Sequence, residues 1–294
     1  MLEKTPATRV QAFLDRFGKA LEAGKIDEAA AMFAEQCFWR DLVAFTWNLR
    51  TLEGRAEIRD MLKSQLGSAR PTGWKVAEGE EATEADGVTE AWITFETRVG
   101  RGYGHIRLKN GLIWTLLTTL AELKGHEEKA GFTRPLGAKH GHGKDRKTWK
   151  EERDDEAAEL GASRQPYCLI IGGGQGGIAL GARLRQLDVP TIIVEKNERP
   201  GDSWRKRYKS LCLHDPVWYD HLPYLPFPDD WPVFSPKDKM GDWLESYTKI
   251  MELNYWVKTE CKRARYDEKA GEWVVEVVRD GKPMSLRPKQ LVLA

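Results

Sequence analysis

The sequence has little that would point to a membrane, a metal centre or a nucleic acid. It contains no run of about 18 apolar residues, so we expect no transmembrane helix. Its four cysteines form no C-x-x-C pair, which argues against a zinc ribbon or a dithiol redox centre. Lys plus Arg (46) nearly balances Asp plus Glu (45), which leaves no charge excess for binding nucleic acid or anionic lipid. The first residues lack a basic flank before an apolar stretch, so we expect no signal peptide and a cytoplasmic location.

The 294 residues suggest two domains joined by a charged linker. Residues 1–125 predict an α+β domain in which helices are followed by a curved antiparallel sheet. The expected helices are Val10–Ala23, Ile26–Phe33 and Arg55–Leu66. The expected strands are Cys37–Leu49, Trp74–Ala82, Gly87–Val99, Gly104–Lys109 and Leu112–Glu122, the last two joined by an Asn110-Gly111 turn.

Residues 126–165 are charged, with glycine and proline interspersed, and predict a linker with one short solvated helix at Glu151–Leu160. His140 and His142 lie in the run K-H-G-H-G. Two histidines without further ligands favour a solvated loop over a metal site. We therefore expect no metal.

Residues 166–294 predict an α/β domain of Rossmann type, incomplete at its C-terminus. Tyr167–Ile171 is an all-apolar run typical of a buried parallel strand, Gly176–Leu187 follows as a helix, and Thr191–Glu195 is the next parallel strand. Further expected elements are a helix that Ser235 caps and that runs from Pro236 to about Met251, and strands at Glu260–Tyr266, Glu272–Arg279 and Leu291–Leu293.

The run G-G-G-Q-G-G satisfies G-x-G-x-x-G directly after the first strand of this domain. Gly172 allows the tight turn, Gly174 lets the backbone approach a pyrophosphate, and Gly177 lets the helix pack closely on the strand. Gly181 lies on the same helix face and extends that contact. Glu195 follows Gly172 by 23 residues, where an acid binds the ribose hydroxyls. An acid there favours FAD or NAD over NADP, whose 2′-phosphate it would repel.

Two segments resemble the N-terminal half of class B flavin-dependent monooxygenases, the flavin-containing and YUCCA-type enzymes. They are Y-C-L-I-I-G-G-G-Q-G-G-I-A-L-G-A-R-L and V-E-K-N-E-R-P-G-D-S-W-R-K-R-Y. Gly201–Arg205 is similar to the family's G-G-x-W element, with Asp202 in place of the second glycine. S-L-C-L-H-D-P and L-P-Y-L-P-F-P-D-D-W-P-V-F-S-P-K-D resemble the YUCCA branch. The likeness covers about Tyr167–Ala294 and favours FAD over NAD.

The resemblance implies a reaction and a set of site residues. NADPH would reduce FAD, and a flavin C4a-(hydro)peroxide formed with O₂ would transfer one oxygen atom to a small organic substrate. Trp204 is expected near the flavin or in the core, while Arg205 and Arg207 reach phosphate or are solvated. His214 is the candidate catalytic residue. The expected cofactor-binding residues are Gly172, Gly174, Gln175, Gly176, Gly177, Glu195, Lys196, Ser203, Trp204, Arg205 and His214.

The sequence departs from this family at its end. It stops at Leu291–Ala294, where relatives continue into A-T-G, and it lacks both the second Gly-rich motif for NADPH and F-x-G-x-x-x-H. We therefore expect a truncated chain that holds the FAD-binding part and not the NADPH region. The alternatives are a flavin-dependent reductase that passes electrons to a partner and a non-catalytic flavin- or ligand-binding module.

The N-terminal domain resembles a SnoaL-like, ketosteroid-isomerase-like cone. The segment F-W-R-D-L-V-A-F-T-W-N-L-R-T-L-E-G-R-A-E-I is similar to N-terminal extensions of some bacterial monooxygenases of this class. The resemblance implies a cavity lined by Trp39 and Trp47, with Asp41 as a base; the alternatives are a solvated or paired Asp41 and a cone that serves as a homodimer contact. His105 is expected to be a surface or core residue.

Overall fold

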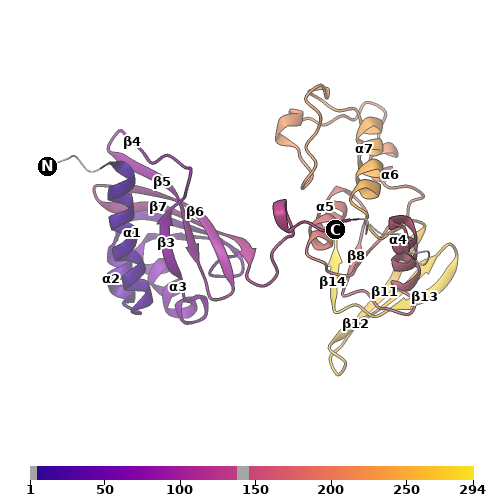
Figure 1. The fold of residues 1–294 in the computed structure, drawn as a ribbon, viewed down its shortest axis with the longest axis horizontal. Coiled ribbons are helices and arrows are strands. Elements are labelled where there is room, and N and C mark those ends of the chain that lie inside the picture. Colours follow the sequence, from indigo (N-terminus) through magenta and orange to yellow (C-terminus); the bar gives the residue numbers. More distant parts are fainter. Residues whose placement is uncertain (1–4, 138–145) are drawn as a thin grey trace. The chain divides into compact units, whose positions relative to one another are not determined.

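The computed structural model describes residues 5–137 and 146–294, so His140 and His142 lie outside the described residues. The chain divides after Glu127 into two compact units, residues 1–127 and 128–294 (Figure 1). The described residues of the predicted linker fall on both sides of this division, with those from Glu128 onward on the side of the second unit.

The N-terminal unit combines three helices with seven strands. The helices are α1 (Pro6–Glu22), α2 (Ile26–Ala31) and α3 (Gly54–Ala69). The strands are β1 (Phe33–Leu42), β2 (Leu49–Glu53), β3 (Thr72–Val76), β4 (Thr83–Ala85), β5 (Val88–Glu96), β6 (Gly100–Lys109) and β7 (Leu112–Leu123). Helix α1 begins four residues before the predicted start because Thr5 Oγ1 accepts a hydrogen bond from the Thr8 N–H and Pro6 suits the first turn.

The strands form one sheet in the order β2-β1-β7-β6-β5-β3, and β4 pairs with β5. The α+β expectation is confirmed, but a wholly antiparallel sheet is wrong because β1 and β7 run parallel. The predicted single strand Cys37–Leu49 is wrong as well: the chain turns back at residues 43–48, so that β1 and β2 pair as an antiparallel hairpin. The Asn110-Gly111 turn between β6 and β7 is confirmed, with φ of +52° and +74°.

The Asp41 carboxylate fixes that unpredicted turn. It accepts hydrogen bonds from the backbone N–H groups of Phe45 and Thr46, and from the hydroxyls of Thr46 (2.7 Å) and Thr118 (2.7 Å). The side chain is 0% exposed. Because Val43 and Trp47 are both held at positive φ, these bonds stabilise a backbone that neither residue favours.

Aromatic rings fill the space between the helices and the sheet. Trp39 stacks on Phe33 at 5.7 Å and meets Phe45 edge-on at 5.1 Å, while Trp74 stacks on Phe95 at 4.6 Å. The predicted cavity is therefore wrong: Trp39 is buried with its indole N–H on Thr118, and Trp47 is 61% exposed. Asp41 is neither a solvated acid nor a candidate base, because its oxygens are engaged in holding the turn.

The second unit contains four helices of α type and seven strands among the described residues. The helices are α4 (Trp149–Glu159), α5 (Gln175–Gln186), α6 (Asp202–Arg205) and α7 (Lys237–Ile250). The strands are β8 (Cys168–Ile171), β9 (Thr191–Val194), β10 (Tyr255–Trp256), β11 (Thr259–Asp267), β12 (Glu272–Arg279), β13 (Lys282–Leu286) and β14 (Gln290–Leu293). Short 3₁₀ turns lie at Gly131–Thr133 and Val217–Tyr219.

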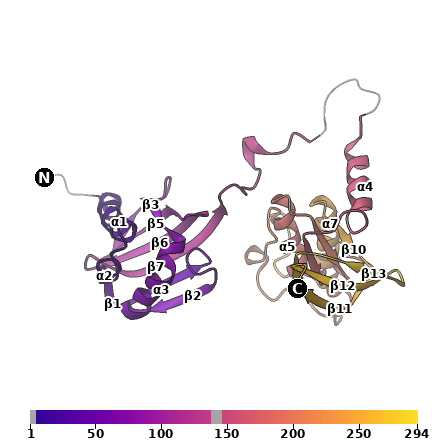
Figure 2. The ribbon, with the colours of Figure 1, turned by 90° about the horizontal axis from the view of Figure 1, so that it is seen from below.

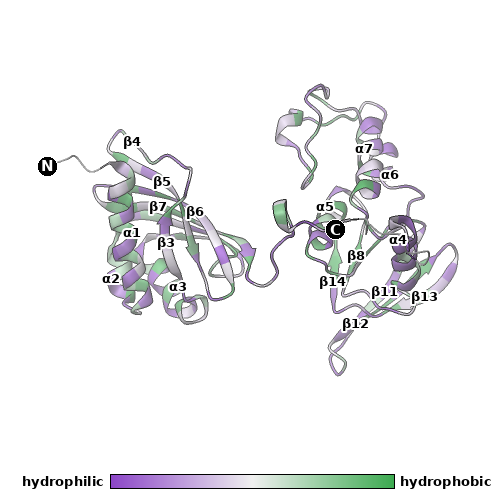
Figure 3. Cartoon of the chain, viewed as in Figure 1, coloured by the Kyte–Doolittle hydropathy of each residue, from purple (hydrophilic) through white to green (hydrophobic). Residues whose placement is uncertain are grey.

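A parallel sheet in the order β10-β9-β8-β14 is the centre of this unit, and the predicted β-α-β segment is confirmed. Ile170 and Ile193 pack toward α5 on one face, and Leu169 and Ile192 toward the β11-β12-β13 sheet on the other. Figure 2 shows this unit from below, and Figure 3 colours β8 and β14 mainly as hydrophobic. The predicted Ser235 cap of α7 is wrong, because Pro236 is the cap position and the buried Ser235 hydroxyl accepts from the Trp231 indole instead.

Helix α4 is hydrophilic (Figure 3) and contains no buried residue, as predicted for a solvated helix, and charged groups tie it to the unit. Arg153 Nη2 donates to the Glu252 carbonyl at 2.6 Å, and Glu156 accepts from Arg185 at 2.6 Å. Arg185 also pairs with the Glu252 carboxylate at 3.3 Å. These contacts, which no local pattern shows, tie α4 to the second unit.

In the part of the chain that the structure describes, no helix combines the length and apolar character needed to cross a bilayer. Nor do three or more His, Cys, Asp or Glu side chains gather there in a way that could hold a metal ion.

We expect Asp41→Ala to destabilise the N-terminal unit by about 3 kcal/mol or more, because it leaves buried donors without an acceptor. The matched control is Glu35→Ala, at an exposed position of the same strand. Hydrogen exchange of β1 and β2 in the full chain measures both. Equal protection in the two variants would contradict the role assigned to Asp41.

We expect the docking of α4 to weaken on acidification. Burial raises the pKa of Glu156, but the hydrogen bond from Arg185 and the charges of Arg185 and Arg153 outweigh it and lower that pKa below 4.5. The stabilisation is therefore present above the unfolded pKa and is lost as the pH falls through the lower folded value.

An NMR titration of the Glu156 carboxyl carbon measures this pKa directly. Glu156→Gln should release α4 to proteolysis already at neutral pH, whereas Glu152→Gln, on the exposed side of α4, should not. A Glu156 that titrates at or above 4.5 would show that the ion pairs do not favour its charged form.

Candidate cofactor site

The glycine-rich turn lies at the carboxyl ends of the parallel strands, between β8 and α5. Gly174 is the N-cap of α5, and no side chain in the described residues caps the first turn. The first N–H groups of a helix lack partners within it, and the helix dipole adds a partial positive charge there. This geometry suits a phosphate or pyrophosphate.

Two glycines make the turn compact. Gly172 has φ of +110°, and a Cβ on it would lie 2.2 Å from the Ala294 carbonyl oxygen. A Cβ on Gly177 would lie 2.0 Å from the Gly172 carbonyl oxygen, and one on Gly181 2.5 Å from Ile193 Cδ1. The close packing of helix on strand that the spacing of Gly177 and Gly181 predicts is thus confirmed.

Gly174 and Gly176 differ from Gly172, Gly177 and Gly181, because a Cβ on either of them would not be crowded. A Cβ on Gly176 would meet nothing within 4 Å, and one on Gly174 only Ser203 Oγ at 4.0 Å. The protein itself does not require glycine at either position. The space in front of this backbone is therefore open to a ligand.

The Glu195 carboxylate links the end of β9 to the turn. Its Oε2 accepts from the Gly173 N–H at 3.0 Å, and its Oε1 accepts from the backbone and side-chain N–H groups of Asn197, both at 2.8 Å. The side chain is 8% exposed. Because a carboxylate offers about four acceptor directions, capacity remains for a ribose hydroxyl.

Ser203, at the start of α6, carries a buried polar atom that the protein does not use. Its hydroxyl oxygen has no hydrogen-bond partner among the described residues and lies 4.0 Å from the position that a Cβ on Gly174 would take. Next to it, the Trp204 indole N–H donates to Gln175 Oε1 at 3.1 Å, which joins α6 to the first residue of α5. Ser203, Trp204 and Gln175 therefore lie together at the turn.

Arg205 was expected either to reach a phosphate or to be solvated, and in the structure its side chain instead contacts other protein groups. Its Nη1 donates to the Pro200 carbonyl at 2.8 Å and to Asp202 at 3.2 Å, and its Nη2 to Asp242 at 2.8 Å and Glu245 at 3.0 Å. The side chain is only 14% exposed, so the solvated alternative is wrong. Its terminal nitrogens hold α6 against α7, whereas Arg207 is exposed.

His214 and Lys196 are not gathered with the turn. The His214 side chain is 92% exposed, with the Asp215 carboxylate 3.7 Å from Nε2. Lys196 is exposed directly after Glu195. No hydrogen bond or ion pair within the described ranges connects either side chain to the glycine turn, so their roles stay predictions.

Two residues that the sequence analysis missed also shape the turn. The Tyr255 hydroxyl donates to the Gly173 carbonyl at 2.7 Å. Burial, followed by the charges of Glu195 and Asp202, raises the pKa of Tyr255, so the hydroxyl keeps its proton. Asn197 orients the Glu195 carboxylate. Asn197 lies within the run V-E-K-N-E-R quoted above, whereas the position of Tyr255 depends on the pairing of a two-residue strand with β9.

We expect Gly177→Ala to destabilise the second unit by about 1–3 kcal/mol, because the new Cβ forces helix and strand apart. Gly176→Ala is the matched control, one residue away in the same helix. With open space around its Cβ, it should be neutral or stabilising by about 0.5–1 kcal/mol. Chemical denaturation of the full chain without added ligand measures both; equal effects would contradict the close-packing argument.

Sequence comparison relates part of the chain to known enzymes, although no protein-family model matches it. It is 35% identical over 127 residues to the probable indole-3-pyruvate monooxygenase YUCCA9 of Arabidopsis thaliana, a match that covers 43% of this chain and 30% of the relative. An uncharacterized CzcO-like oxidoreductase of Geobacillus kaustophilus is 40% identical over 92 residues, or 31% of this chain and 26% of the relative.

Among solved structures, a flavin-containing monooxygenase of Stenotrophomonas maltophilia aligns with a TM-score of 0.40 at 22% identity, over 44% of this chain and 38% of that one. OTEMO in complex with FAD and NADP aligns with a TM-score of 0.39 at 22% identity, over 45% of this chain and 26% of that one. The chain spans under a third of the length of the curated relatives named above, and over that part it is homologous to YUCCA-type monooxygenases.

Proposed function

We propose that the second unit binds FAD at the glycine turn. The observation that carries this proposal is the Ser203 hydroxyl, a buried polar atom without a partner that lies beside the open backbone at Gly174. Buried polar groups are normally hydrogen-bonded, and the exceptions include atoms whose partner is a water, an ion or a ligand. A bound dinucleotide would supply one.

The surrounding residues fit the parts of such a ligand. The first N–H groups of α5 would hold the pyrophosphate, and Glu195, already aligned by Gly173 and Asn197, would accept from the adenosine ribose. A phosphate on that ribose would meet the Glu195 charge, which favours FAD over NADP. The choice of FAD over NAD rests on the resemblance of Gly201–Arg205 to the flavin family. When bound, FAD supplies electron transfer and oxygen chemistry that no side chain provides.

We infer further that the whole protein is an FAD- and NADPH-dependent monooxygenase that uses O₂ to oxidise a small organic substrate. The relatives named as monooxygenases support this inference. The residues of the second unit would orient and shield the cofactor. The SnoaL-like character of the N-terminal unit, a homodimer formed through it and a cytoplasmic location stay predictions.

The test is FAD binding by the purified full chain, followed by gel filtration and a visible spectrum. We expect a retained flavin spectrum. Ser203→Ala should weaken FAD binding by about tenfold without lowering stability, because it removes one ligand contact and an unsatisfied polar atom together. Ser210→Ala, an exposed serine nearby in sequence, should leave binding unchanged. A folded wild-type chain that retains no flavin would refute the proposal.

A further inference from the structure

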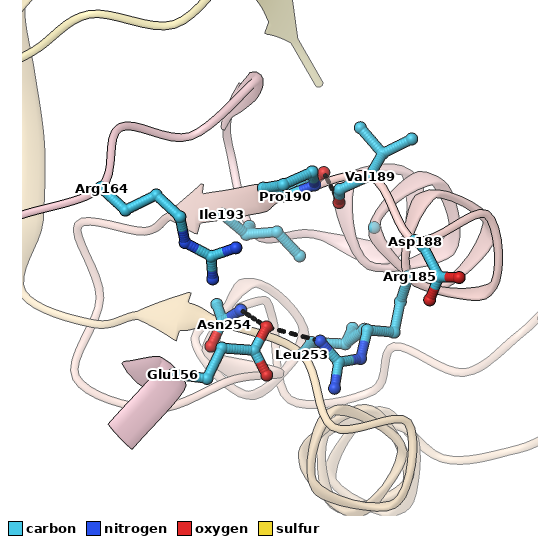
Figure 4. A pocket seen from close by; sticks show the side chains of 11 residues that line it. Glu156, Arg164, Arg185, Asp188, Val189, Pro190, Ile193, Leu253 and Asn254 are labelled. Atoms are coloured by element: carbon cyan, nitrogen blue, oxygen red, sulfur yellow. Dashed lines mark hydrogen bonds and ion pairs between the residues drawn. The ribbon is translucent and has the colours of Figure 1, made fainter. Parts of the chain in front are cut away.

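A cavity of about 280 Å³ lies in the second unit, away from the glycine turn (Figure 4). Val189, Pro190 and Thr191 line it at the amino end of β9, and Leu253 and Asn254 line it just before β10. The glycine turn follows the carboxyl end of β8, which runs parallel to β9. The cavity and the proposed FAD site are therefore at opposite ends of the same strands.

At this cavity, all charged side chains except one are engaged in ion pairs among the described residues. Arg185 and Arg153 pair with Glu156 and Glu252, so these two cations and two anions balance. Asp188, which also lines the cavity, pairs with Lys129 at 2.6 Å. Arg164 is the remaining charged group, and within residues 146–294 and 5–137 no ion pair or hydrogen bond to its side chain is found. One positive charge is left over.

The backbone of Arg164 is held in a tight turn, and the residue itself is exposed. Its N–H donates to the Glu159 carbonyl at 3.0 Å, and its own carbonyl accepts from the Gly161 N–H at 2.7 Å, in the tight turn after α4. Figure 4 shows its side chain extending into the cavity toward Asn254 and Glu156. A ligand in the cavity would meet this guanidinium directly.

Beside the charged groups and the polar residues Thr191 and Asn254, the lining has an apolar part. Val189, Pro190, Ile193 and Leu253 contribute side chains to the cavity. A free inorganic anion would leave this surface unused, whereas an organic anion would bury an apolar body against it. The side-chain amide of Asn254, which also lines the cavity, donates to Glu156 at 3.3 Å.

We propose that this cavity binds a small organic carboxylate, with the carboxylate on Arg164 and the apolar body on Val189, Pro190 and Leu253. The planar guanidinium matches a carboxylate through two parallel hydrogen bonds. This site is distinct from the glycine turn and does not depend on the proposed function. It would let an acidic metabolite bind the unit without competing for the dinucleotide position.

The test uses benzoate as probe, added to the full chain without FAD and followed by NMR shifts of the Gly181 and Asn254 amides. We expect saturable shifts with a Kd of about 1 mM or tighter. Arg164→Gln should weaken benzoate binding by about tenfold or more. Arg263→Gln, which removes the same charge from an exposed position on β11 outside the cavity, should leave it unchanged.

Two further probes separate the contributions. Benzamide, which has the same apolar body without the charge, should bind much more weakly, and inorganic phosphate, which has the charge without the body, should do so too. Absence of benzoate shifts, equal affinity for any of these probes, or an unchanged Kd in Arg164→Gln would overturn the proposal. Loss of FAD binding would not, since benzoate is measured in its absence.

Discussion

The arrangement of the second unit depends on one close approach, that of the first turn of α5 to the end of β8. No side chain fits between Gly177 and the Gly172 carbonyl oxygen. Once helix and strand meet there, Glu195 from β9 and Tyr255 from β10 both bond to Gly173, so three neighbouring strands fix the same turn. Helix α7 then packs on α5 through Leu244 and Tyr247. The close backbone contact thus fixes the shape of the site, and the positions of the surrounding side chains depend on that contact.

The β-α-β segment could be predicted because each part of it is local: an apolar strand, a glycine spacing, a helix and an acid. Strand β10 could not, since two residues become a strand only through pairing with β9. The turn after β1 was missed because Asp41 is bonded by Thr118, 77 residues away in sequence. Helix α4 was predicted, but its attachment was not, because Glu252 and Arg185 are contributed by distant segments.

In the candidate site, too, residues set by local spacing could be predicted, and residues that depend on distant segments could not. The glycines and Glu195 could be predicted from the sequence, because their spacing alone sets their geometry. The role of Arg205 was not, since Asp242 and Glu245 approach it from α7, and their carboxylates turn an expected phosphate ligand into a brace between helices. The buried, unpartnered hydroxyl of Ser203 could not be predicted either, because its burial depends on the packing of α6 near the glycine turn.

The aromatic interior of the N-terminal unit limits how this unit could evolve. Making room for an enclosed ligand would mean truncating rings such as Trp39, Trp74 or Phe95, each of which is buried among the others. Each truncation costs about 3–5 kcal/mol, while a whole domain has a margin of roughly 5–15 kcal/mol. Two or three such steps would unfold it. New binding properties would therefore arise on the outer surface of this unit, where substitutions leave the stacked rings untouched.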